Sequence, residues 1–105
     1  MAEVDNFLGI RIDADAYAVR LEEVAGLFVD RKILPLPSPI EELLGLTGLR
    51  GVVLPTYSLA ALLGYPGKAG AARWLVVARA EHQVGLAFEQ FEGHLQIPRA
   101  ELGKS

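Results

Sequence analysis

Cysteine is absent from this 105-residue sequence, which excludes disulfide bonds, cysteine-ligated zinc and thiol catalysis and is typical of a reducing compartment. Basic residues are scattered, and ten Lys and Arg against thirteen Asp and Glu give a net charge of −3. Nucleic-acid and anionic-membrane surfaces normally show clustered basic residues, so neither is expected here. No apolar run reaches the roughly 18 residues of a membrane span, and the acidic N-terminus does not resemble a signal peptide. We therefore expect a cytoplasmic protein that neither binds nucleic acid nor inserts into a membrane.

Residues that could perform catalysis or hold a metal are also sparse. The two histidines, His82 and His94, have no third ligand or ordered carboxylate to complete a metal site, so solvated side chains explain them better. Ser58 lacks the glycine context of a nucleophilic serine. No glycine-rich segment carries the Lys-Ser/Thr pair of a phosphate site. The sequence therefore predicts no enzyme, no metal and no cofactor.

Apolar residues, in contrast, make up 51% of the chain, which is enough for the core of one domain over residues 1–105. Short β-type runs separated by turn residues dominate the pattern. They cover residues 7–12, 17–21, 24–29, 52–57, 74–79, 84–88 and 91–97. Pro35 and Pro37 confine residues 33–37 to a sheet edge or an extended connection. Because no β-α-β alternation is present, we expect a mostly β chain of six or seven short strands in compact barrels.

Two serines mark expected helical turns. Ser38, Pro39 and Glu41 form a capping box that predicts a helix over residues 39–44, with Gly45 as its end. Ser58 predicts a capped turn over residues 59–63, followed by Gly64. Residues 65–72 have the composition of a loop.

The stretch Leu46-Thr47-Gly48-Leu49-Arg50-Gly51-Val52-Val53-Leu54-Pro55 places one cation and a glycine between two apolar β-type runs. No nucleophile or carboxylate pair surrounds Arg50, so a binding surface is a better interpretation than a reacting pocket. A guanidinium can hold carboxylates or carbonyls of a partner in a planar fork. The alternative is that Arg50 pins its own turn by bonding local carbonyls.

Several spaced segments together resemble the CheW-like domain of bacterial chemotaxis adaptors and of chemotaxis histidine kinases. They include Ile33-Leu34-Pro35-Leu36-Pro37, the Arg50 stretch, Leu59-Ala60-Ala61-Leu62-Leu63-Gly64 and Val84-Gly85-Leu86-Ala87-Phe88. The resemblance covers about residues 7–97 and leaves residues 98–105 as a short tail. It implies a pair of small SH3-like barrels with short helical turns. A second barrel that lacks some of its strands is compatible with this resemblance. Three positions differ from the family pattern. Gly48 stands where the family usually has Asn, and Ser58 stands where it usually has Asp. Gly26 stands where the family commonly has an acidic residue.

The same resemblance implies a non-enzymatic adaptor that couples chemoreceptors to a chemotaxis histidine kinase. The implied partners are the cytoplasmic tip of the receptors and the regulatory domain of the kinase. The implied protein-binding residues are Leu49, Arg50, Gly51 and Val24, and for Val24 a core position remains the alternative.

Three further interpretations follow from the β pattern and from the length of the chain, which is shorter than is usual for the family that it resembles. A truncated modulator would bind only one partner of the signalling array. A barrel without its closing strands would leave an open sheet edge and self-associate through it, unless it closes with fewer strands. A small-ligand-binding β-barrel would instead show an enclosed cavity lined by Trp74, Tyr57 and Phe88.

Overall fold

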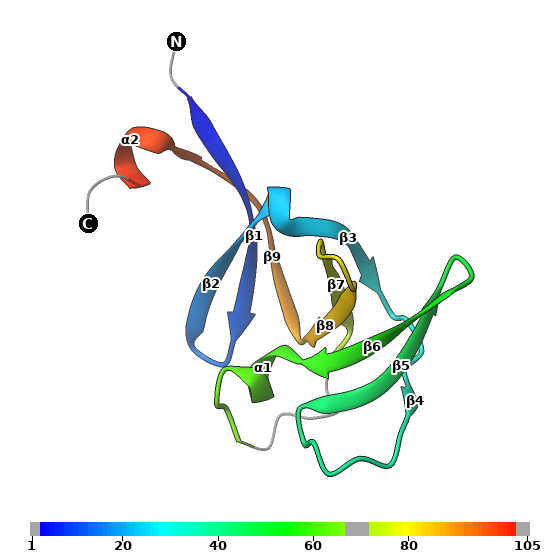
Figure 1. The fold of residues 1–105 in the computed structure, drawn as a ribbon. Coiled ribbons are helices and arrows are strands. Elements are labelled where there is room, and N and C mark those ends of the chain that lie inside the picture. Colours follow the sequence, from blue (N-terminus) through cyan, green and yellow to red (C-terminus); the bar gives the residue numbers. More distant parts are fainter. Residues whose placement is uncertain (1–2, 67–71, 103–105) are drawn as a thin grey trace.

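The computed structural model describes residues 3–66 and 72–102, and β-strands make up most of this part (Figure 1). The strands are β1 (Val4–Ile12), β2 (Asp15–Arg20), β3 (Val24–Val29), β4 (Leu34–Pro35), β5 (Leu43–Leu49), β6 (Val52–Ser58), β7 (Trp74–Ala78), β8 (Val84–Phe88) and β9 (Gln90–Pro98). The helical turns are η1 (Leu21–Glu23), α1 (Leu59–Leu62) and α2 (Arg99–Leu102). The mostly β prediction is confirmed. Nine strands exceed the six or seven expected, since β4 is only a two-residue pairing and β5 starts where a helix was expected.

The strands form two sheets within the described residues. The smaller has the order β2-β1-β9, and the larger has the order β3-β7-β8-β6-β5-β4. All pairings are antiparallel except that of β6 with β8. In the described part of the chain β3 and β4 are the edges of the larger sheet, so strand pairing leaves that sheet open.

The first hairpin forms as its Asp-rich turn predicts. Ile12 pairs with Asp15, and Asp13 takes a positive φ of 54°, a conformation that Asp tolerates better than most residues. In β9 the register passes from Gly9–Gly93 to Ile10–Phe91, which leaves Glu92 as the extra residue of a β-bulge. A second bulge occurs in β3 between Val24 and Gly26.

Two clusters of buried side chains form the core. One joins the two sheets and contains Leu8, Ile10, Ile12, Val24, Ala60, Val76 and Phe88. The other lies within the larger sheet and contains Leu49, Leu54, Leu75, Val77 and Ala87. The buried hydroxyls of Thr47 and Thr56 hydrogen-bond to each other at 2.6 Å, so both polar groups have a partner. The small and large sheets are therefore held together by shared apolar burial.

The helix expected over residues 39–44 is absent, and that prediction is wrong. Ser38 does accept a hydrogen bond from the Ile40 N–H, at 3.1 Å, but the chain makes only a turn there. Leu43 already pairs with Tyr57, and the Ser58 N–H donates to the carbonyl of Glu42 at 2.8 Å. Sheet pairing therefore outweighs the local helix signal, as tertiary contacts often do for short segments.

Gly45, expected to end that helix, instead lies inside β5. A Cβ on Gly45 would be 2.0 Å from the carbonyl oxygen of Leu34. The glycine therefore permits the close approach of β4 to β5.

The second helical turn forms as expected. The Ser58 side chain accepts a hydrogen bond from the Ala61 N–H at 3.1 Å, and Gly64, with φ of 93°, ends the turn. Most of the loop expected after it, residues 67–71, lies outside the described residues.

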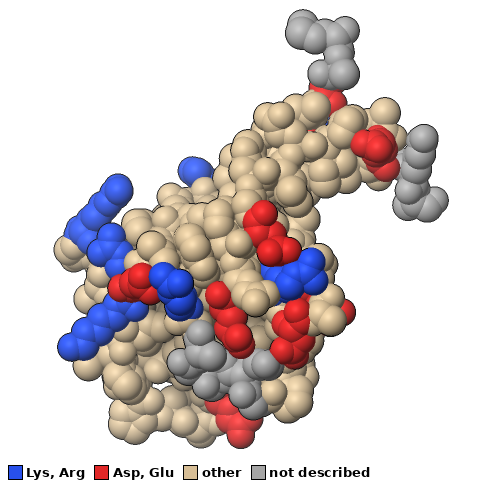
Figure 2. All heavy atoms as spheres, turned by 180° about the vertical axis from the view of Figure 1, so that it is seen from behind, with Lys and Arg blue, Asp and Glu red and all other residues tan. Residues whose placement is uncertain are grey.

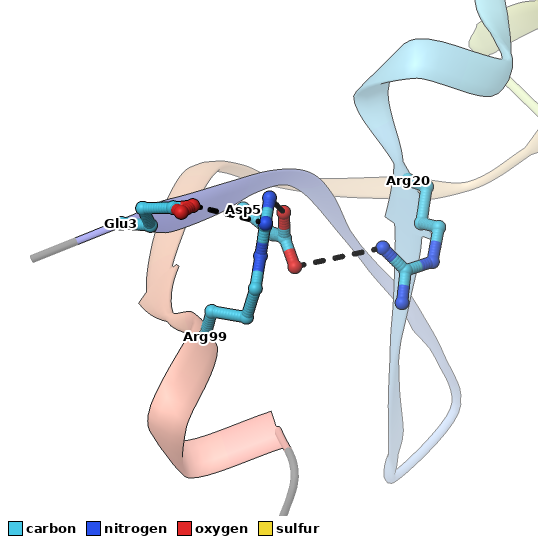
Figure 3. A network of polar contacts seen from close by, with 4 residues as sticks. All are labelled: Glu3, Asp5, Arg20 and Arg99. Atoms are coloured by element: carbon cyan, nitrogen blue, oxygen red, sulfur yellow. Dashed lines mark hydrogen bonds and ion pairs between the residues drawn. The ribbon is translucent and has the colours of Figure 1, made fainter.

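The start of β1 and the end of β9 project from the rest of the molecule as an arm that ends in α2 (Figure 1). The Arg99 guanidinium donates to Glu3 Oε2 at 3.1 Å and to Asp5 Oδ1 at 2.9 Å (Figure 3). Arg20 Nη1 lies 3.7 Å from Asp5 Oδ2. The Arg99 hydrogen bond lowers the pKa of Asp5 below its ordinary value. Residues 99–102, expected to be part of a tail, are thus a tethered helical turn.

Candidate functional site

Arg50 and Gly51 are the two central residues of the hairpin that joins β5 to β6. Leu49 pairs with Val52, and Arg50 and Gly51 have positive φ angles of 50° and 80°. Two positive φ angles define a type I′ turn, whose twist suits a two-residue hairpin. Such turns favour Asn, Asp and Gly at the position that Arg50 occupies. An arginine therefore stands in a conformation that its Cβ makes unfavourable.

The Arg50 side chain is exposed, and its guanidinium makes no hydrogen bond or ion pair within residues 3–66 and 72–102. The bonds to local carbonyls that a turn-pinning role requires are thus missing from the described residues. The turn is closed by its backbone pairing and by Gly51. The guanidinium remains free to meet a partner.

A hollow of about 230 Å³ lies beside Arg50, and we call it the Arg50 groove. Its lining comes from β3, from the β5–β6 hairpin and from β7 of the larger sheet, and from the β7–β8 turn. The lining residues are Ala25, Phe28, Leu49, Arg50, Val52, Leu54, Val77 and Gln83. The Arg31 guanidinium lies 5.1 Å from the centre of the Phe28 ring, at cation–π distance. The groove therefore combines an apolar floor with one unpaired cation at its rim.

The structure brings three of the four expected binding residues together. Leu49, Arg50 and Gly51 are consecutive in the hairpin, although Leu49 is only 8% exposed and belongs to the core. Val24 is also 8% exposed, and it packs in the cluster that joins the two sheets. Its side chain therefore lies in the core, the alternative that the sequence left open, and does not line the Arg50 groove.

A family model of the CheW-like domain matches residues 6–105. The chain belongs to the CheW-like domain family. Among solved structures, it is similar to the scaffolding protein TtCheW from Thermoanaerobacter tengcongensis, with a TM-score of 0.78 at 18% sequence identity. That match covers 90% of this chain and 66% of TtCheW, and it confirms the expected CheW-like fold. A comparison with curated protein sequences gives no match.

Two glycines of this CheW-like domain stand where the sequence departs from the family pattern, and they differ in their surroundings. A Cβ at Gly26 would lie 2.8 Å from Phe28 Cε2, so the glycine makes room for a ring that lines the Arg50 groove. A Cβ at Gly48 would meet nothing within 4 Å. Gly26 therefore has a packing role, whereas Gly48 leaves open space beside the Arg50 hairpin.

Sequence reasoning missed the residues that reach the Arg50 groove from β3, from β7 and from the β7–β8 turn, namely Phe28, Val77 and Gln83. Only the curl of the larger sheet brings them to the hairpin. A signal was present for the exposed residues beside Arg50. Consecutive residues of a strand point to opposite faces, so the adjacent pair Val52-Val53 presents apolar side chains on both faces of the sheet edge. Val52 is 54% and Val53 62% exposed.

Several other polar groups of the CheW-like domain have structural partners. His94 Nε2 hydrogen-bonds to Asn6 Oδ1 at 2.9 Å, and Arg73 holds Asp30 in a bidentate pair at 3.0 Å, which lowers the pKa of Asp30. No three side chains of metal-binding type come together in the described residues. Figure 2 shows acidic and basic side chains close together on the face that it presents. Among helices in the described ranges, none is long and apolar enough to span a membrane.

Two of the three aromatic residues proposed to line a ligand cavity, Trp74 and Phe88, are engaged in packing. The Trp74 and Phe91 ring centroids are 5.0 Å apart, and Phe88 is 2% exposed. A cavity beside Phe88 has a volume of about 10 Å³, which suits at most one water molecule. These observations disfavour a small-ligand site at this place.

Proposed function

We propose that this CheW-like domain is a non-enzymatic adaptor that couples chemoreceptors to a chemotaxis histidine kinase. The observation behind the receptor contact is the unpaired Arg50 guanidinium at the rim of an apolar groove. A receptor tip offers carboxylates and backbone carbonyls, which a guanidinium binds with a planar fork. The Arg50 groove would take the apolar side chains of the same tip.

An adaptor also needs a second surface for the kinase regulatory domain. Leu34, Leu36 and Ile40 are 57%, 38% and 50% exposed around the β4 edge of the larger sheet. Exposed apolar side chains close together in the chain are typical of protein contacts. We assign the kinase contact to this segment, which lies apart in sequence from the Arg50 hairpin.

The test is receptor-tip binding by Arg50→Ala. Buried arginine anchors in interfaces are commonly worth 2 kcal/mol or more, so affinity should fall by about 30-fold. Arg11→Ala is the matched control, because Arg11 is an exposed cation on the smaller sheet that pairs with Glu92. Equal affinity of the wild type and Arg50→Ala, measured by isothermal titration calorimetry, would remove the receptor contact from this site.

The modulator alternative makes a different prediction for a ternary mixture. An adaptor recovers receptor tip and kinase regulatory domain in one complex, whereas a modulator recovers either one but never both. Size-exclusion chromatography of the three purified components separates the two functions.

A further inference from the structure

Half of β6 has a free edge. β8 pairs in parallel with Thr56, Tyr57 and Ser58 only, so residues 52–55 pair with β5 alone. The segment that precedes β8, residues 80–83, turns away from β6 toward β7. The space beside residues 52–55, in line with β8, is therefore not occupied by a strand of the described residues.

The free edge carries backbone groups that can bind another strand. In a two-residue hairpin the pair that flanks the turn, here Leu49 and Val52, is hydrogen-bonded, and the pairs then alternate along the ladder. Val53 and Pro55 consequently direct their backbone groups away from β5. Val53 offers an N–H donor and a carbonyl, whereas Pro55 offers only a carbonyl.

A hollow of about 490 Å³ lies along this edge, lined by residues 52–55 and 80–84. Val52 is 54% exposed and Val53 is 62% exposed. At about 3.3 Å per residue, the four residues of the edge span about 13 Å. The turn at Arg50 bounds the edge at one end, and the beginning of β8 bounds it at the other.

We propose that this edge binds an extended strand from a partner polypeptide, with apolar side chains against Val52 and Val53 and a carboxylate beside Arg50. The charge argument comes from Arg50, in the turn that precedes the edge, and from Glu81 in the lining of the hollow. Arg50, unpaired within the described residues, lies two positions before Val52 in the turn that bounds the edge, whereas Glu81 lines the hollow and opposes a second negative charge there. An antiparallel strand places its C-terminal end next to Arg50. This mode of binding adds main-chain hydrogen bonds to side-chain contacts.

The probe is the peptide acetyl-Thr-Thr-Val-Val-Asp-amide, whose adjacent valines point to opposite faces as Val52 and Val53 do. It is titrated into the whole chain and followed by NMR. We expect the Val53 amide resonance to shift and its hydrogen exchange to slow at least tenfold. Val53→Pro removes the N–H donor and should abolish binding, whereas Val53→Thr keeps the donor and should bind. Arg50→Glu should lose binding of the Asp peptide and gain binding of the same peptide with Lys in place of Asp. This charge reversal tests the proposal without introducing a proline into β6.

Three outcomes would overturn the proposal. Resonance shifts confined to Ala25, Phe28 and Val77 would place the peptide in the Arg50 groove instead. Equal binding by Val53→Pro and Val53→Thr would rule out the backbone contact. Self-association that Val53→Pro abolishes, detected by sedimentation velocity, would identify a second copy as the occupant.

Receptor-tip binding distinguishes this inference from the proposed function. Val53 does not line the Arg50 groove. If both proposals hold, Val53→Pro should therefore lose binding of the peptide and retain binding of the receptor tip. Each proposal can fail without the other.

Discussion

At the residue scale, Arg50 combines an unfavourable backbone conformation with a side chain that has no partner in the described residues. Its φ of 50° is the left-handed region, which costs an ordinary L-residue about 1 kcal/mol. Strained residues of this kind are often found at binding sites. The sequence could identify the residue and its turn, but not the lack of local hydrogen bonds, because that depends on side-chain geometry.

Replacing Arg50 by Asn should separate stability from binding. Asn tolerates positive φ, so Arg50→Asn should raise the free energy of unfolding by up to about 1 kcal/mol, which corresponds to a rise in Tm of up to about 4–8 °C. Receptor-tip affinity should fall as in Arg50→Ala, which keeps the backbone strain and should not gain stability. A lower Tm for Arg50→Asn in differential scanning calorimetry would mean that the arginine itself stabilises the turn.

At the element scale, the two serine caps show how far local signals reach. Ser38 and Ser58 each accept a backbone N–H, yet only Ser58 begins a helical turn. Residues after Ser38 lie next to Tyr57 and Ser58 of β6, so pairing with that strand competes with the helix. A capping box describes only the local preference, and a four- to six-residue helix is too weak to resist this competition.

The contact of β4 with β5 should depend on Gly45. Gly45→Ala would place a Cβ against the Leu34 carbonyl, so we expect a loss of about 2 kcal/mol or more in the free energy of unfolding. Gly48→Ala is the matched control in the same strand, where a Cβ meets nothing within 4 Å, and should change stability by less than about 0.5 kcal/mol. Urea denaturation measures both. Similar losses for the two variants would show that alanine destabilises β5 at either position, independently of the close approach of β4.

At the scale of the whole molecule, the chain is 50 Å long and 22 Å thick, because the arm projects from the packed sheets. Figure 1 shows both ends of the described chain at this arm. Ion pairs among Glu3, Asp5, Arg20 and Arg99 connect its parts (Figure 3). Hydrogen bonds that link residues more than ninety positions apart cannot be inferred from local sequence patterns.

The arm should make stability depend on pH in the acid range. Because Arg99 lowers the folded-state pKa of Asp5, the ionised carboxyl stabilises the fold at pH values above its unfolded pKa of about 3.9. This contribution is lost as the pH falls through the lower folded-state pKa. Asp5→Asn should therefore be less stable than the wild type at pH 6 and approach it at pH 2.5. A constant difference in Tm between the two proteins over this range would contradict the linkage.

Turn chemistry and side-chain periodicity act over a few neighbouring residues, and from them the sequence indicated the β character, the Arg50 turn and the Ser58 cap. The resemblance of its spaced segments indicated the family. Tertiary structure alone decided that residues 39–44 do not form a helix, that Val24 is buried, and that Phe28 and Val77 meet Arg50 in one groove. It also decided that β8 pairs with only the second half of β6, which leaves one edge of residues 52–55 without a neighbouring strand in the described residues. The physical reason is that such outcomes depend on contacts between strands distant in the chain, whose combined burial and hydrogen bonding exceed local preference.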